Sequence, residues 1–229
     1  MSIAVKCAIE ENYNYPDFAK WFRLYYKKYP RAGYGSGFTN WCLDEKRNAY
    51  GSWANGSAMR VGYIGAIYND IDDVIKHAYN SAVVTHNHLE GIKGAVVTAV
   101  CVWMCKNGYT KEDVKEYLYL HYAYTKEQLE NKTYGCMYYN LLDLNNINYK
   151  TDDSISCSFS VPYAIYCFLE SSSLEDCYLK ILDHFCDADT VCAIAGGMAG
   201  IYYGIDKKYH EILKDKLSTE LYLILEKDI

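Results

Sequence analysis

The chain has 229 residues, of which 51% are hydrophobic, and a net charge of −6. A chain of this length can bury one substantial core, so we expect a single domain over residues 1–229. Acidic and basic residues are scattered, which leaves no basic stripe for a nucleic-acid partner. No apolar run has the roughly 20 residues of a membrane span, and the first residues, with Lys6, Glu10 and Glu11, lack a signal-peptide pattern. We therefore expect a cytoplasmic protein with no membrane partner.

The cysteines predict no disulfide framework. The sequence holds ten of them, spread along the chain with no CxxC pair. Cys101 and Cys105 lie one helical turn apart in an apolar run, where a free cysteine behaves as a small hydrophobic residue. We expect reduced thiols in the core.

The spacing of apolar residues predicts an all-α fold. They recur mostly three or four positions apart, and only three prolines interrupt the chain. The expected helices cover residues 2–11, 15–29, about 70–80, 91–106, 162–170, 191–203 and 207–226. For the fifth, Ser160 is the expected cap and Pro162 the first helical residue, where its missing N–H does no harm. The helix at 91–106 is apolar almost all round and should be buried at the centre.

Two further helix starts and one surface segment are expected. Thr110 with Asp113, and Thr125 with Gln128, have the spacing of capping boxes. Residues 140–156 are polar and rich in Asn and Asp, which indicates an excursion at the surface.

The first candidate site is GSWANGSAMR at residues 51–60, inside a glycine-rich segment at 33–65 that we expect to be largely loop. Glycine lets backbone approach a ligand closely, and successive N–H groups can form an anion-binding concavity. Arg60 could add a positive charge. A surface turn followed by a structural arginine explains the same residues, and glycine content alone favours that interpretation.

The second candidate is THNHLEGIKGA, which places His86 and His88 just before the apolar helix. Histidines there can hydrogen-bond a phosphate or ribose, helped by the helix dipole. A metal pair would need a third ligand, and none is evident. Alternatively, Thr85 or Asn87 caps the helix and Glu90 supports the cap.

The third candidate is DADT at residues 187–190. Asp187, Asp189 and Thr190 offer three hard oxygen ligands, which suit Mg²⁺. Aspartates also favour helix starts, so a plain cap cluster explains the same residues.

Together and in this order, these segments and SVPYAIYCFLES at residues 160–171 resemble the ADP-ribosylglycohydrolase family. The similarity runs from the first helix through YPRAGYGSGFTNW at residues 29–41 to Gly204, and four motifs at compatible spacing are specific. The resemblance implies a compact bundle of many helices. It also implies a cleft for ADP-ribose attached to a protein or small molecule, with two Mg²⁺ ions that position the ribose and the attacking water.

The resemblance assigns roles to individual residues. Gly51, Ser52, Trp53, Asn55 and Gly56 correspond to the loop around the diphosphate and ribose, and His86 to a histidine that contacts the ligand. Ser57 and Arg60 of the same segment are further candidates for ligand binding. His88 has less support. Asp187, Asp189 and Thr190 correspond to the C-terminal metal ligands, and the two aspartates would take part in catalysis in an active enzyme.

The departures from the family pattern concern the metal site. The chain begins after the Gly-Asp, glutamate and Thr-Asp-Asp elements of the family, so it resembles a shortened member without the usual first helix and N-terminal metal ligands. Phe185 and Cys186 stand where a glycine pair is usual, and Ala54 where glycine is common, which should crowd the site. A second Thr-Asp-Asp string at residues 151–153 lies in the wrong segment.

A two-metal site that lacks one set of ligands cannot keep both ions, because anionic ligands offset the cost of dehydrating each ion. We expect a protein that binds an ADP-ribose-type nucleotide, with an incomplete Mg²⁺ site and with hydrolysis lost or impaired. It could sequester an ADP-ribose-derived signal, for instance for a phage that faces NAD-based host defence. The alternatives are an active Mg²⁺-dependent hydrolase, with ligands from other acids, a partner chain or a preceding segment, and an interaction protein with a collapsed cleft.

Overall fold

The computed structural model describes residues 1–122, 155–184 and 186–227. Within these residues the secondary structure is twelve α-helices and one 3₁₀ helix. Extended pairing in the same residues is limited to an isolated antiparallel bridge between Ala54 and Ser156. The predicted all-α fold is confirmed. The expected cap at Thr125 and nearly all of the expected excursion at 140–156 lie outside the described residues.

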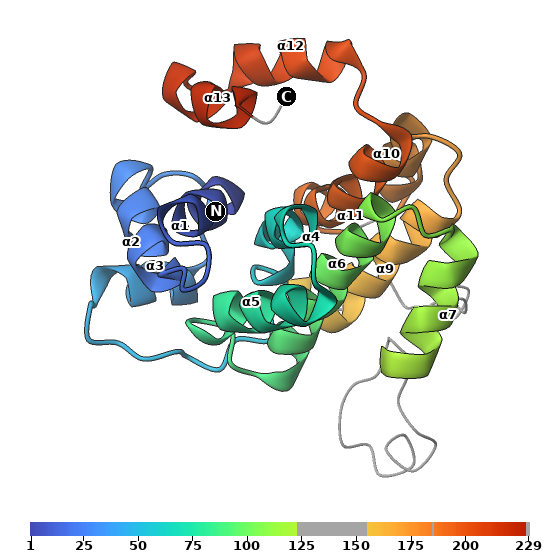
Figure 1. Ribbon diagram of the computed structural model, residues 1–229. Helices are drawn as coiled ribbons and strands as arrows, with labels where there is room; N and C mark the ends of the chain where they lie inside the picture. The colour runs from blue at the N-terminus through green and yellow to red at the C-terminus, as the bar shows by residue number, and fades with distance from the viewer. Residues whose placement is uncertain (123–154, 185, 228–229) are drawn as a thin grey trace.

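Most of the described helices follow one another through short connections, and a longer segment joins α3 to η1 (Figure 1). The first half of the chain forms α1 (Ser2–Glu11), α2 (Phe18–Lys28), α3 (Ser36–Leu43), η1 (Ala58–Arg60), α4 (Gly62–Ile67), α5 (Ile71–Val83), α6 (Leu89–Lys106) and α7 (Lys111–Tyr122). The second half forms α9 (Cys157–Leu169), α10 (Leu174–Leu182), α11 (Ala188–Tyr203), α12 (Lys207–Lys216) and α13 (Thr219–Glu226).

Helix α6 lies at the centre, as its sequence predicts. It packs against α4, α5, α9 and α11 (Figure 1), and its apolar side chains, such as Val97 and Val100, are fully buried. Cys101 and Cys105 are free thiols in this core, and burial raises the pKa of Cys105 to about 12. The expectation of reduced core cysteines is confirmed for the described ones. Of the described helices, none is both long enough and apolar enough to cross a bilayer.

Several helix boundaries differ from the predicted ones. The segment at 33–65 is largely loop, as expected, but it also contains α3, η1 and most of α4. Helix α9 begins at Cys157, not at Pro162, because Ser156 is the cap and its hydroxyl accepts the N–H of Phe159. Pro162 therefore lies inside the helix, where it removes one backbone hydrogen bond.

The expected C-terminal helix is two helices. The helix ends at Lys216, and Ser218 caps a new one by accepting the N–H of Leu221. No residue of α12 or α13 is buried. The pair crosses above α1 and α2 (Figure 1), where Glu220 forms an ion pair with Lys28. These helices are thus an outer layer over the N-terminal ones.

The α4–α6 contact gives a prediction about stability. A methyl group at Gly65 would lie 2.2 Å from the carbonyl oxygen of Ala99 in α6, so Gly65→Ala must push the helices apart. We expect a loss of about 3 kcal/mol in the free energy of unfolding, measured by urea denaturation. Gly62→Ala is the control, because its nearest neighbour would be 3.9 Å away, and it should change stability by less than about 1 kcal/mol. Equal effects of the two substitutions would contradict this description of the packing.

Candidate functional site

The glycine loop at residues 51–57 is attached along one side to the histidine segment. The N–H of Tyr50 donates to the carbonyl oxygen of Thr85 at 3.3 Å, and the N–H of Gly51 donates to Oδ1 of Asn87 at 2.7 Å. Gly51 has φ +69°, a conformation that favours glycine. The side chain of Asn87 therefore fixes the first turn of the loop.

The start of α6 approaches the same loop very closely. A Cβ atom on Gly91 would lie 2.6 Å from the carbonyl oxygen of Ser52 and 2.9 Å from Cβ of His86. The hydroxyl of Ser57 donates to the carbonyl oxygen of Gly91 at 2.7 Å. Any larger residue at position 91 would separate the loop from the helix.

The opposite side of the loop is attached to the start of α9. Besides the Ala54–Ser156 bridge, the N–H of Asn55 donates to the carbonyl oxygen of Ile155 at 2.8 Å, and the N–H of Cys157 donates to that of Trp53 at 3.0 Å. The loop is thus held between two helix starts that are far apart in sequence.

The side chain of Asn55 connects the loop to the DADT motif. It is 6% exposed, and its amide nitrogen donates to Oγ of Ser160 at 2.9 Å and to Oδ2 of Asp187 at 2.8 Å. One buried amide therefore joins three of the four motifs. We call the residues gathered here the loop site: Gly51, Ser52, Trp53, Asn55, Gly56, Ser57, His86, Asp187, Asp189 and Thr190.

Asp187 and Asp189 lie together at the start of α11. Burial raises the pKa of Asp187, and the negative charge of Asp189 acts in the same direction, while the hydrogen bond from Asn55 opposes them. Asp187 precedes α11, but its side chain accepts no backbone N–H of the helix. A simple capping role therefore does not account for its carboxylate.

His86 is a buried, neutral histidine. It is 4% exposed, its Nδ1 lies 2.7 Å from Oγ1 of Thr85, and its ring centroid lies 5.9 Å from that of Tyr50. Burial, together with the positive charge of Arg60, lowers the pKa of His86 to about 2. The imidazole faces the loop as a neutral hydrogen-bonding group.

The structure assigns His88 and Asn87 to supporting roles. Nδ1 of His88 accepts the N–H of Glu90, so His88 is the cap of α6. The expectation that Thr85 or Asn87 caps this helix is wrong, because both are hydrogen-bonded to other segments.

Arg60 does not reach the exposed side of the loop. It is 1% exposed, and its Nη2 donates to the carbonyl oxygen of Ser81 at 2.7 Å and to Oγ1 of Thr85 at 3.0 Å. The guanidinium lies 4.1 Å from the ring centroid of Phe22. Arg60 therefore occupies the position expected of a structural arginine, with its positive charge in the core behind His86.

The order and spatial convergence of these motifs agree with the comparisons to known proteins. The sequence profile of ADP-ribosylglycohydrolase matches residues 2–221. The chain belongs to the ADP-ribosylglycohydrolase family.

Relatives of the chain include ADP-ribosylhydrolase ARH3 of Homo sapiens, which is 28% identical over an alignment of 246 positions that covers 86% of this chain and 67% of that protein. An uncharacterized protein of Archaeoglobus fulgidus is 32% identical over 178 residues, or 73% of this chain and 57% of that protein. A solved structure described as an ADP-ribosylglycohydrolase-related protein complex has a TM-score of 0.70 at 18% identity, and the match covers 97% of this chain and 76% of that one. The chain spans about two thirds of the length of the human relative.

The family resemblance implies Mg²⁺, and the chain offers three oxygen donors whose chemistry suits one such ion. Asp187, Asp189 and Thr190 supply two carboxylates and a hydroxyl on one helical turn, and Mg²⁺ commonly completes such a set with water or substrate oxygens. In the described part of the chain, no group of three or more His, Cys, Asp or Glu side chains is arranged to hold a metal ion.

Sequence reasoning missed Tyr50, which precedes the loop directly. Its ring lies against Gly37, where a Cβ atom would be 2.9 Å away, and its hydroxyl group interacts with Ser52. An aromatic residue directly before a glycine turn was the available signal. Of the residues expected to crowd the site, Phe185 lies outside the described residues, and the thiol of Cys186 is directed to the carbonyl oxygen of Ile181 in α10.

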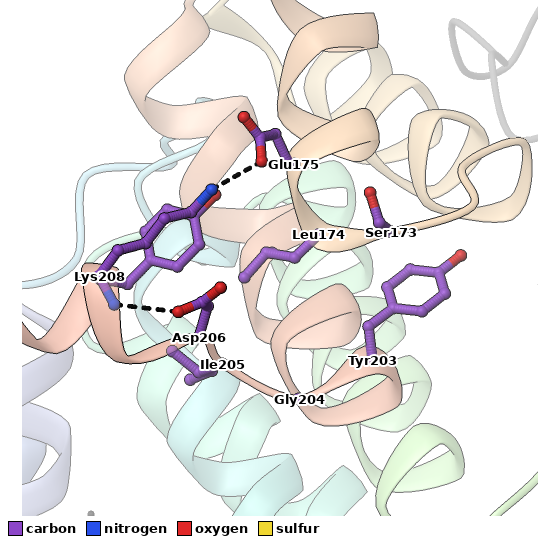
Figure 2. Close-up of a pocket in the computed structure, with 9 residues that line it drawn as sticks. Ser173, Leu174, Glu175, Tyr203, Gly204, Ile205, Asp206 and Lys208 are labelled. Atoms are coloured by element: carbon purple, nitrogen blue, oxygen red, sulfur yellow. Dashed lines mark hydrogen bonds and ion pairs between the residues drawn. The ribbon is translucent and has the colours of Figure 1, made fainter.

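A cavity of about 400 Å³ lies elsewhere, between α10, the end of α11 and the start of α12 (Figure 2). Its charged groups pair with one another, since Lys208 lies 2.6 Å from Glu175 and Asp206 caps α12. Its tyrosine Tyr203 is hydrogen-bonded to Ser171. The cavity contains no residue of the loop site, so we place the candidate function at the loop.

The burial of His86 predicts a pH dependence of stability. Its pKa is lowered to about 2 in the folded protein, against about 6.5 when unfolded. The unfolded chain therefore binds the extra proton between these values, and stability falls as the pH drops below 6.5, by about 1.4 kcal/mol per unit. Replacing His86 with Asn should remove this slope.

The measurement is urea denaturation of the wild type and His86→Asn between pH 8 and pH 5. The difference at pH 8 gives the effect of the substitution apart from titration. Parallel curves down to pH 5 would show that His86 titrates normally in the folded protein.

Proposed function

We propose that this member of the ADP-ribosylglycohydrolase family binds an ADP-ribose-type nucleotide at the loop site and hydrolyses it slowly or not at all with the described residues alone. The observation that carries the proposal is the buried amide of Asn55, which links the loop to Ser160 and to Asp187. A loop connected in this way is preorganised, so a ligand need not order it on binding.

The chemistry of the loop site suits a nucleotide diphosphate. The loop contributes backbone N–H groups beside the start of α6, where the helix dipole favours negative charge. Neutral His86 can donate a hydrogen bond to an oxygen atom. Trp53 is 40% exposed, and its ring offers a surface on which a base or ribose can stack.

The acidic pair supports binding of the ribose end. Asp187, Asp189 and Thr190 would hold one Mg²⁺ ion, which would orient ribose hydroxyls or a water molecule. Fast hydrolysis needs developing charge to be stabilised by preorganised groups. With one cation in place of two, we expect turnover to be lower by orders of magnitude than in a complete two-metal site.

Hydrolysis is the second candidate function. It is favoured by the relatives named ADP-ribosylhydrolase ARH3, a name that describes hydrolysis by those proteins. A protein that binds without cleaving would instead sequester an ADP-ribose-derived signal in the cytoplasm, for instance during a phage infection opposed by NAD-based defence.

Two measurements on the full chain separate these functions. Calorimetry with ADP-ribose, with and without Mg²⁺, gives affinity and metal dependence, and incubation with peptides ADP-ribosylated on serine or arginine tests for release. We expect binding that survives metal chelation and no release. Release that requires Mg²⁺ and is lost in Asp189→Ala would overturn the proposal in favour of hydrolysis, and no binding under either condition would exclude both.

Trp53 provides a point substitution with a matched control. Stacking of a base on an aromatic side chain contributes about 1–3 kcal/mol, so Trp53→Ala should weaken ADP-ribose binding roughly tenfold or more. Trp53→Phe keeps an aromatic face and should stay within about threefold of the wild type. Unchanged affinity in Trp53→Ala, measured by calorimetry, would show that the ring does not contact the ligand.

A further inference from the structure

Arg60 is a buried cation with no buried anion beside it. It is 1% exposed, and among the described residues no carboxylate lies within ion-pair distance of its guanidinium. Its contacts are a carbonyl oxygen, a hydroxyl group and an aromatic ring, and its Nε has no hydrogen-bond partner. Burying a positive charge without a paired anion costs free energy, so the groups that contact this guanidinium are of particular interest.

The hydroxyl of Thr85 lies between Arg60 and His86. Nη2 of Arg60 is 3.0 Å from Oγ1 of Thr85, and that oxygen is 2.7 Å from Nδ1 of His86. A guanidinium can only donate, so the hydroxyl oxygen accepts from Arg60. The hydroxyl proton then remains available for one acceptor, and Thr85, which is fully buried, has Nδ1 of His86 as the neighbour that can accept it.

This order of donors and acceptors determines which nitrogen of the imidazole carries the proton. When Nδ1 accepts a hydrogen bond, a neutral histidine carries its proton on Nε2. A Cβ atom on Gly56 would lie 3.1 Å from Nε2, so this nitrogen faces the glycine loop. Within the described residues Nε2 has no hydrogen-bond partner, and its N–H is therefore available to a ligand.

We propose that Arg60 is a positioning residue that acts through Thr85 to hold His86 as the Nε2–H tautomer, so that the imidazole donates a hydrogen bond to an oxygen of the ligand beside Gly56. The part that concerns the ligand rests on the proposed function, whereas the tautomer is a property of the free protein. A site that presents only a donor selects an acceptor, such as a phosphate or ribose oxygen, and rejects an amine at the same point.

The charge of Arg60 supports this role in a second way. Together with burial, it lowers the pKa of His86 to about 2. Tyr50, the other titratable group packed against the ring, carries a raised pKa caused mainly by burial and stays neutral. The imidazole therefore remains a neutral donor when the solution becomes mildly acidic.

The first arm of the test is nitrogen NMR of the histidine side chains in the free, full-length protein. The spectrum of His86→Asn identifies the signals of His86. We expect the wild type to show an unprotonated Nδ1 and a protonated Nε2 from pH 8 to pH 6. A protonated Nδ1 would overturn the proposal. This measurement on the wild type needs no folded variant of Arg60 or Thr85.

The second arm of the test removes the hydroxyl of Thr85 that connects Arg60 to His86. Thr85→Val has the same shape without the hydroxyl, and Thr85→Ser restores the hydroxyl. We expect Thr85→Val to give a mixture of the two His86 tautomers and Thr85→Ser to keep the Nε2–H form. Arg60→Met, which removes the donor, should behave like Thr85→Val. A single Nε2–H tautomer in Thr85→Val would overturn the positioning role.

The third arm links the tautomer to the ligand. Calorimetry with ADP-ribose should show affinity about twofold weaker in Thr85→Val, because apparent affinity falls in proportion to the fraction of protein that holds the Nε2–H tautomer, and unchanged affinity in Thr85→Ser. A change of tautomer without a change in affinity would overturn the donor role of His86. If the wild type shows the Nε2–H tautomer but does not bind ADP-ribose, the proposed function fails and the positioning role of Arg60 stands.

Discussion

The candidate site depends on one interaction, the pair of hydrogen bonds from the buried amide of Asn55 to Ser160 and Asp187. An amide nitrogen has two hydrogens to donate, and here each meets an acceptor from a different helix. Burial makes the arrangement strict, since a buried donor left without a partner costs about 1–3 kcal/mol. The loop, α9 and the start of α11 are consequently linked to one another through this one side chain.

Around that link, charges of opposite sign are kept apart. The guanidinium of Arg60 lies in the core behind His86, and the carboxylates of Asp187 and Asp189 lie at the start of α11. The glycine loop runs between them, held to both sides by backbone hydrogen bonds.

Much of this was predictable from the sequence because it depends on local patterns. The apolar run at 91–106 identifies the central helix, and the four motifs identify nearly every residue of the loop site. Local patterns could not predict which distant residues would be the hydrogen-bond partners of these side chains. Thr85 has the chemistry of a helix cap, but its hydroxyl is used by Arg60 and His86, so His88 takes the capping position. Ser156 replaces Ser160 as the cap of α9 because its segment is fixed by the bridge to Ala54.

The outer layer formed by α12 and α13 has a consequence for how the molecule opens. Neither helix buries a residue, and the ion pair between Lys28 and Glu220 is largely exposed on both sides. Salt screens exposed pairs of this kind, so raised ionic strength loosens this attachment while the core around α6 stays intact. Amide protons in the last two helices should therefore exchange with solvent through local detachment, on a faster timescale than those of α6 or α11.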